Sequence, residues 1–366
     1  MSNKVWYQLA DRVVRAGKMP FPVTDTMIEF FQALITEEEA ELLTLFSKNS
    51  MNIDEIMEVA EAPREKVEEL LENLMRKGFI AGTHSRTTGA RVYTLMPPFP
   101  GIIEFQMMRG KKDKESQKIA EYMEKLFAEL RDGAQRNYDM MMSGAKTLPV
   151  PARVVPVNEV VSDEPDMIIP SEDIDQIVDA QDKFALAHCY CRIERDLTGK
   201  PCQVTDIRHN CLIFGKVAEF AISYEFAREI TREKAKEVMR EAENNGLVHK
   251  IFHSQLDMTR DIDGICSCCS CCCGLFRLFN EGAIPFHTVT YYLARVESEN
   301  CIACGTCEDK CPLDAIQIQD DLAVVDEEKC IGCGVCVHFC PEDPEGIKLL
   351  NTEQRKIFIL PPRIAD

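Results

Sequence analysis

The chain has 366 residues, which is too long for a lone ferredoxin and enough for two or three domains. Its 45% hydrophobic and 28% charged residues are typical of a globular protein, and no apolar run approaches the ~18–20 residues of a membrane span. The 61 acidic and 42 basic residues give a net charge of −19, which repels phosphate backbones and argues against a nucleic-acid partner.

Residues 1–35 are predicted to form a helical leader, with a turn around Pro20 and Pro22. Its first ten residues lack the apolar segment and cleavage site of an export signal, so a cytoplasmic location is expected. In a reducing compartment, cysteines serve as metal ligands rather than disulfides. The chain has 18 cysteines and none before Cys189, so metal chemistry is expected in its second half.

Residues 36–98 have the pattern of a winged-helix-like domain. Thr36 and Glu39 form a capping box for a first helix. The remaining expected elements are a helix over Ile53–Val59, a helix after Pro63 that stops at Gly78, a cap at Asn52, and strands over Phe79–Thr83 and Arg91–Leu95 around the wing loop Ser85–Gly89.

The charges on the third helix indicate whether this domain binds DNA. The wing carries the basic residues His84, Arg86 and Arg91, but the third helix mixes acidic and basic residues and makes a poor phosphate partner. Its charged residues are Glu65, Glu68, Glu69 and Glu72 against Arg64, Lys66, Arg76 and Lys77. This balance favours a docking or dimerisation module over a DNA-binding one.

Residues 99–287 are interpreted as a cysteine-rich, mostly helical middle domain. The expected elements are an amphipathic helix over 111–133, a Pro-rich extended stretch over 148–170, a helix from Ser171 to Asp182, and a helix capped by Thr231 that ends at Asn245–Gly246. The ten cysteines of this domain are Cys189, Cys191, Cys202, Cys211, Cys266, Cys268, Cys269, Cys271, Cys272 and Cys273.

This density of cysteines has no explanation in packing, because six thiols in eight positions cannot all face one core. The two groups are expected to share a ligand set for a further metal centre. Ten thiols suffice for two more [4Fe–4S] clusters with two to spare or for one larger cluster; zinc and catalytic dithiol chemistry are the alternatives. Adjacent cysteines point apart in an extended chain, so one of each pair is expected to bind a given cluster.

Charged neighbours of the first cysteine group allow two interpretations. His188 is either a further ligand or a buried core histidine. Arg192, Arg208 and His209 either tune a redox potential or pair with Asp196 and Asp206.

The clearest motif is a duplicated run of the form C-x2-C-x2-C-x3-C-P. Its two copies lie 29 residues apart, and Gly305 and Gly334 let each loop bend closely around a cluster. The fourth cysteine of such a run ligates the other cluster. Crossed ligation predicts one [4Fe–4S] cluster on Cys301, Cys304, Cys307 and Cys340, and a second on Cys330, Cys333, Cys336 and Cys311. Two zinc sites are the alternative, but they require neither the duplication nor the prolines.

At these residues the sequence resembles the bacterial two-cluster ferredoxin domain, over about residues 288–350. Strands are expected near Thr290–Val296, Ile316–Ile318 and Ala323–Val325, and 351–366 is expected to be a C-terminal tail. The whole layout, with GLVH at Gly246–His249 and PFPGIIEF at Pro98–Phe105, is similar to anaerobic multidomain iron–sulfur proteins. That resemblance implies an electron-carrying subunit of a larger oxidoreductase.

Together these patterns predict an α+β multidomain fold and an electron-transfer function. The chain has neither GxGxxG nor a P-loop, so the redox partner is expected to be an oxidoreductase that holds flavin or another cofactor. Two alternatives stay open: a thiol or disulfide reductase that uses the middle cysteines, and a redox-sensing winged-helix regulator. The substrate and the oligomeric state are not predicted.

Overall fold

The computed structural model describes residues 3–19, 21–84, 89–157, 173–342 and 346–364. Pro20, the wing-tip residue Arg86 and the predicted cap Ser171 lie outside the described residues. Among the described helices, none has the length and apolarity needed to cross a membrane.

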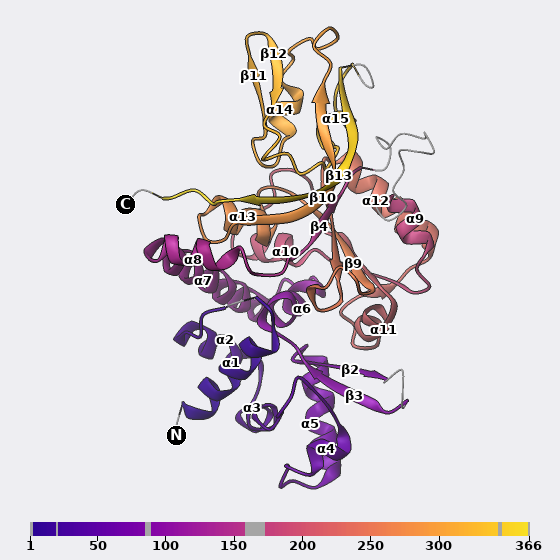
Figure 1. The fold of residues 1–366 in the computed structure, drawn as a ribbon. Helices are drawn as coiled ribbons and strands as arrows, with labels where there is room; N and C mark the ends of the chain where they lie inside the picture. The colour runs from indigo at the N-terminus through magenta and orange to yellow at the C-terminus, as the bar shows by residue number, and fades with distance from the viewer. Residues whose placement is uncertain (1–2, 20, 85–88, 158–172, 343–345, 365–366) are drawn as a thin grey trace.

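The N-terminal part consists of two helices and a winged helix at one end of the molecule (Figure 1). The predicted capping box is present, because the Thr36 hydroxyl accepts from the Glu39 amide and the Glu39 carboxylate accepts from the Thr36 amide. The three strands pair antiparallel in the order β1-β3-β2. The elements are α1 (Lys4–Ala16), α2 (Asp25–Leu34), α3 (Glu37–Thr44), β1 (Ser50–Asn52), α4 (Ile53–Met57), α5 (Arg64–Arg76), β2 (Ile80–His84) and β3 (Arg91–Leu95).

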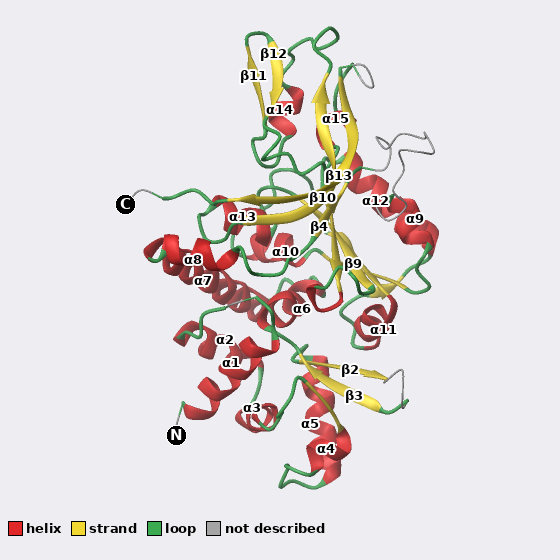
Figure 2. Ribbon diagram, viewed as in Figure 1, coloured by secondary structure: helices red, strands yellow, loops and turns green. Residues whose placement is uncertain are grey.

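A six-stranded antiparallel sheet in the order β4-β8-β9-β6-β5-β7 organises the middle region (Figure 2). Its strands are β4 (Arg153–Val155), β5 (Phe184–His188), β6 (His209–Phe214), β7 (Arg228–Glu229), β8 (Val248–His253) and β9 (Ile262–Cys268). The helices are α6 (Ile103–Met108), α7 (Lys114–Arg136), α8 (Tyr138–Ala145), α9 (Ile174–Asp179), α10 (Tyr190–Leu197), α11 (Gly215–Ser223), α12 (Arg232–Asn244) and α13 (Gly274–Asn280).

The regular structure of the middle region is mostly helical, as predicted, but the sheet was not predicted. Helices are numerous, but the strands are short apolar runs, and such runs cannot be told from buried helix by periodicity. The helix expected from Ser171 to Asp182 is the shorter α9, and its cap is Asp173, whose carboxylate accepts from the Gln176 amide. Helices α9 and α12 pack on one face of the sheet around Val178, Val238 and Met239.

In the C-terminal region a long antiparallel ladder carries two cysteine loops. Strand β10 (Phe286–Val296) pairs with β13 (Ile347–Ile359) from Phe286↔Ile359 to Val296↔Ile347. Residues 351–359 were predicted as a tail and instead complete β13, because the other half of β10 offers them a partner strand. The remaining elements are α14 (Thr306–Lys310), β11 (Ile316–Gln319), β12 (Leu322–Val325) and α15 (Val335–His338).

The winged helix packs directly against the middle region. At the end of α5, the Arg76 carbonyl oxygen accepts from the Arg109 guanidinium at 2.7 Å, and the Lys77 carbonyl oxygen accepts from the Gln106 side-chain amide at 3.1 Å. The Arg91 guanidinium donates to the Tyr224 hydroxyl at 2.7 Å, and this hydroxyl also lies 3.0 Å from the Glu72 carboxylate. The base of the wing and helix α5 are therefore fixed to the rest of the protein.

Candidate metal centres

The two C-terminal cysteine loops share one backbone design. Gly305 and Gly334 precede α14 and α15 with φ of 79° and 75°, the left-handed region that glycine adopts without strain. Gly332 also has a positive φ, and a Cβ there would lie 2.4 Å from the Tyr292 carbonyl oxygen. Glycine at these positions lets the loops curl tightly without backbone strain, and Ala303, the counterpart of Gly332 in the first loop, also has a positive φ, of 50°.

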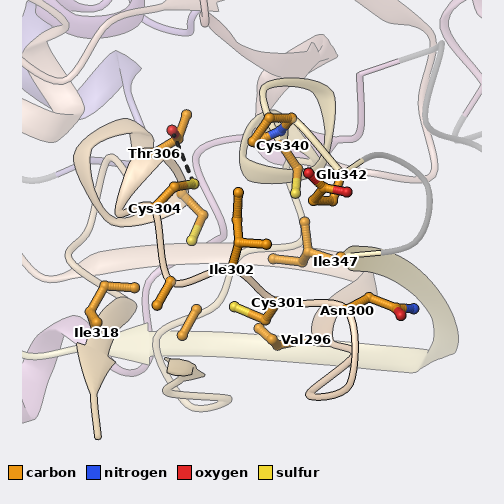
Figure 3. A pocket seen from close by; sticks show the side chains of 15 residues that line it. Val296, Asn300, Cys301, Ile302, Cys304, Thr306, Ile318, Cys340, Glu342 and Ile347 are labelled. Carbon is orange, nitrogen blue, oxygen red and sulfur yellow. Dashed lines mark hydrogen bonds between the residues drawn. The ribbon is translucent and has the colours of Figure 1, made fainter. Parts of the chain in front are cut away.

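The first loop surrounds a hollow that is open to solvent. It is lined by Cys301, Cys304, Cys307 and Cys340. Figure 3 labels three of these, Cys301, Cys304 and Cys340, whose sulfur atoms lie around this space. Cys304 is exposed, and its sulfur lies 3.4 Å from the Thr306 hydroxyl. The structure thus brings Cys340 to the first loop, which is the grouping that crossed ligation requires; ligation itself stays a prediction.

The second loop gathers the other four cysteines in a more buried place. Cys330, Cys333 and Cys336 are buried, and Cys311 interacts electrostatically with Cys333 and Cys336. Burial raises the pKa of Cys333 to about 12, so a bound cation is needed to hold its thiolate. The Cys311 sulfur accepts from the Ala315 amide at 3.2 Å, the kind of hydrogen bond that supports a thiolate.

The ten middle cysteines divide into two groups. The tetrathiol group is Cys202, Cys269, Cys271 and Cys272, whose sulfur atoms all lie within 4.8 Å of one another. The six-thiol group is Cys189, Cys191, Cys211, Cys266, Cys268 and Cys273; its contacts run from Cys189 through Cys191 and Cys273 to Cys268, and from Cys266 to Cys211.

Strand geometry explains why neighbouring cysteines separate. Cys266 and Cys268 lie on one face of β9, and Cys266 pairs with Cys211 of β6. Cys269 follows the end of the strand and begins the turn that leads to α13, so it joins the other group. Cys272 lies in this turn and Cys273 caps α13, and these adjacent cysteines also fall into different groups.

Two buried cations lie beside these thiols. Arg192 is fully buried, and although burial opposes its charge, Cys189, Cys269 and Cys202 raise its pKa. Lys250 is 1% exposed; its ammonium lies 3.8 Å from the Phe276 ring centroid and has no hydrogen-bond partner among the described residues. Buried cations without full pairing fit an anionic metal–thiolate centre.

Lys250 was not singled out in the sequence. It pairs with Cys266 across β8 and β9, and its charge favours the thiolates of Cys268 and Cys273. The available signal was a lysine in the mostly apolar run Leu247–Phe252, whose other polar residue is His249 and which contains no acidic residue.

An ion-pair network, also not predicted, fixes the helices that carry the cysteines. Arg277 of α13 donates to Glu124 of α7 at 2.8 Å and to Glu194 of α10 at 3.0 Å. Arg195 and Lys200 pair with the same Glu124 at 2.9 and 2.7 Å. The network therefore joins α7, α10 and α13 behind Cys191 and Cys273.

The neighbouring basic residues have structural contacts. Nδ1 of His188 lies 3.2 Å from the Met108 carbonyl oxygen, and its ring packs 3.8 Å from that of His209. Arg208 forms a two-pronged ion pair with Asp196 at 2.8 and 2.9 Å. His188 therefore lies outside both thiol groups as the structure describes them.

Comparison with known families identifies two parts of the chain. Residues 294–349 match the family model of a 4Fe–4S dicluster domain. This part is a ferredoxin-type domain. Residues 35–99 match the family described as sugar-specific transcriptional regulator TrmB, in agreement with the winged helix. Searches of curated proteins and of solved structures found no match.

The ferredoxin domain accounts for eight cysteines, and neither match covers the other ten. The hollow lined by four cysteines and the buried thiols of the second loop both suit a cluster that takes one thiolate on each iron. When bound, such clusters supply one-electron redox chemistry. The domain match and the cysteine groups together support an iron–sulfur electron-transfer role.

Proposed function

We propose that this chain is an electron-transfer protein that serves an anaerobic oxidoreductase and carries a further iron–sulfur centre at the six-thiol group. One observation carries this proposal: Cys333 of the ferredoxin domain packs in the same apolar core as Cys268 and Cys273 of the six-thiol group. A centre held by those thiols would adjoin the cluster held by the second loop.

Further contacts support a rigid path between the two parts. The Val157 amide donates to the Cys333 carbonyl oxygen at 3.0 Å. Gly246, after α12, lies against the Phe339 ring that follows α15. Electron transfer needs fixed separation and exclusion of water, and an apolar, hydrogen-bonded contact supplies both.

The outer end of this path is the hollow at the first loop. Cys304 is exposed, and the apolar side chain of Ile302 beside it is 59% exposed, so this cluster site opens to solvent. A redox partner with its own flavin or other cofactor would dock here. Arg192 and Lys250 would offset the negative charge of the inner centre and raise its potential.

Anaerobic purification with iron and sulfide counting tests the proposal. The ferredoxin domain accounts for about eight irons, and a further cubane would bring the total to about twelve. The variant Cys191→Ser with Cys273→Ser should lose about four irons and keep both ferredoxin signals in the electron paramagnetic resonance (EPR) spectrum. A count of about eight in the unaltered protein, unchanged in the variant, would refute the inner centre.

The TrmB match favours a second candidate, a redox-sensing regulator that binds DNA. The exposed face of α5 argues against it, because Glu65, Glu68 and Glu69 lie there, with Lys66 already paired to Glu69 and to Glu38. The base of the wing is tied to Tyr224 as well. Fluorescence anisotropy with random duplex DNA, on reduced and oxidised protein, should detect no binding at physiological salt; redox-dependent binding would favour the regulator.

A further inference from the structure

The four thiols of the tetrathiol group are too close together for an iron–sulfur cubane. Sulfur–sulfur separations are 3.6 Å for Cys202–Cys269, 3.6 Å for Cys202–Cys271 and 3.6 Å for Cys271–Cys272. All four atoms lie within 4.8 Å of one another. Four thiolates at about 2.3 Å from one zinc ion, arranged as a tetrahedron, are separated by about 3.8 Å.

A cubane would require a different arrangement. Each of its four thiolates binds a different iron, so the sulfur atoms must diverge around the cluster. Among the described residues, no other three cysteines meet the same closeness, and this includes the eight cysteines of the ferredoxin domain. The two kinds of site are therefore distinguishable within one chain.

We propose that Cys202, Cys269, Cys271 and Cys272 bind a single zinc ion in a closed, structural site. Cys269 and Cys272 are buried, and the other two thiols are half-buried, so four protein ligands enclose the ion and leave no position for a substrate. Cys202 is separated by 67 residues from Cys269, so the ion would tie the loop after α10 to the turn after β9.

The surroundings suit the charge of such a site, because four thiolates around Zn²⁺ carry two negative charges. The buried Arg192 interacts with Cys202 and Cys269, and its guanidinium is fixed by the Asn210 side chain at 2.9 Å and the Ser267 carbonyl at 3.1 Å. Backbone amides of Thr205 and Gln203 donate to Cys202 and Cys271. Charge balance and amide donors are the outer partners that stabilise metal thiolates.

Metal analysis of the full chain, purified anaerobically, tests this site independently of the iron–sulfur proposal. We expect about one zinc per chain, and growth with cobalt should give the visible bands of a tetrahedral tetrathiolate cobalt site. Cys271→Ala should lose the zinc and keep all iron. Cys211→Ser, in the other group, should keep the zinc.

A ligand exchange guards against simple misfolding. Cys271→His should retain zinc in a three-cysteine, one-histidine site, with a shifted cobalt spectrum. Loss of about four irons in Cys271→Ala, or a mononuclear iron in place of zinc in the unaltered protein, would overturn the zinc assignment. So would zinc that stays bound in Cys271→Ala. None of these results changes the iron expected at the six-thiol group.

Discussion

Removing Arg277 should loosen the helices that carry Cys191 and Cys273. Arg277 is 5% exposed, and its guanidinium donates hydrogen bonds to Glu124 and Glu194. The Cζ atom of the guanidinium lies 4.7 Å from the centroid of the Phe127 ring. Arg277→Met keeps much of the side-chain volume and removes the contacts with both carboxyl groups.

The size of the effect follows from these contacts. Two charge-assisted hydrogen bonds contribute about 1.5–3 kcal/mol each, and breaking a buried ion pair costs about 3–5 kcal/mol. Burial raises the pKa of Glu194 to about 8, so this carboxyl is mostly protonated at neutral pH and leaves little bare charge. Glu124 keeps Arg195 and Lys200. We therefore expect a loss of about 3 kcal/mol, toward the low end of the range.

Circular dichroism melts under nitrogen measure this loss. At about 2 °C per kcal/mol for a chain of this size, the Tm of Arg277→Met should fall by about 6 °C. Iron in the folded fraction should fall as well, because α10 and α13 hold the six-thiol group. Adding Glu194→Gln should change the Tm of Arg277→Met little at neutral pH, since the Glu194 carboxyl is already mostly protonated there. A Tm within about 2 °C of the unaltered protein would refute the argument.

Four further changes test separate parts of the structure. Cys301→Ser should remove the EPR signal of the outer cluster and spare the inner one; equal loss of both in a folded protein contradicts crossed ligation. Tyr224→Phe should lower the Tm by about 2–4 °C, because Arg91 and Glu72 of the winged helix lose hydrogen bonds to the Tyr224 hydroxyl that contribute about 1–2 kcal/mol. An unchanged Tm would show that these hydrogen bonds do not stabilise the contact between the winged helix and the middle region. Because folding raises the pKa of Glu194 from 4.5 to about 8, stability should fall as the pH rises through that window, and Glu194→Gln should flatten the pH profile of the Tm; a profile equally steep in the variant argues otherwise. Lys250→Met should lower the reduction potential of the six-thiol centre by on the order of 100 mV, since a unit positive charge several ångströms away stabilises the added electron by about 2–3 kcal/mol. An EPR redox titration that shows no shift in potential would count against a centre near Lys250.

Elements with strong local signals were predicted closely. Thr36, Asn52 and Thr231 cap helices as expected, because a cap depends on a few neighbouring residues. The third helix of the winged helix and its hairpin strands were also found close to the predicted bounds. Local hydrogen bonding and hydrophobic spacing are enough for such elements.

Elements that depend on distant partners were missed. The sheet of the middle region pairs β4 with β8 and β6 with β9. These strands lie far apart in the sequence, so no local sequence pattern predicts their pairing. Residues 351–359 become strand because β10 is long enough to receive them. Whether such a segment forms a strand depends on the neighbouring strand with which it can pair.

The sequence by itself determined that the chain has a ferredoxin domain and predicts its iron ligands, because the spacing of a duplicated loop is a local property. It also indicated that the ten other cysteines are too densely placed for core packing alone to explain them. Only the tertiary structure decided how those ten divide. Cys202 reaches Cys269 only because the loop after α10 lies beside the end of β9, and Cys268 faces the ferredoxin domain only because alternate strand residues point to opposite faces.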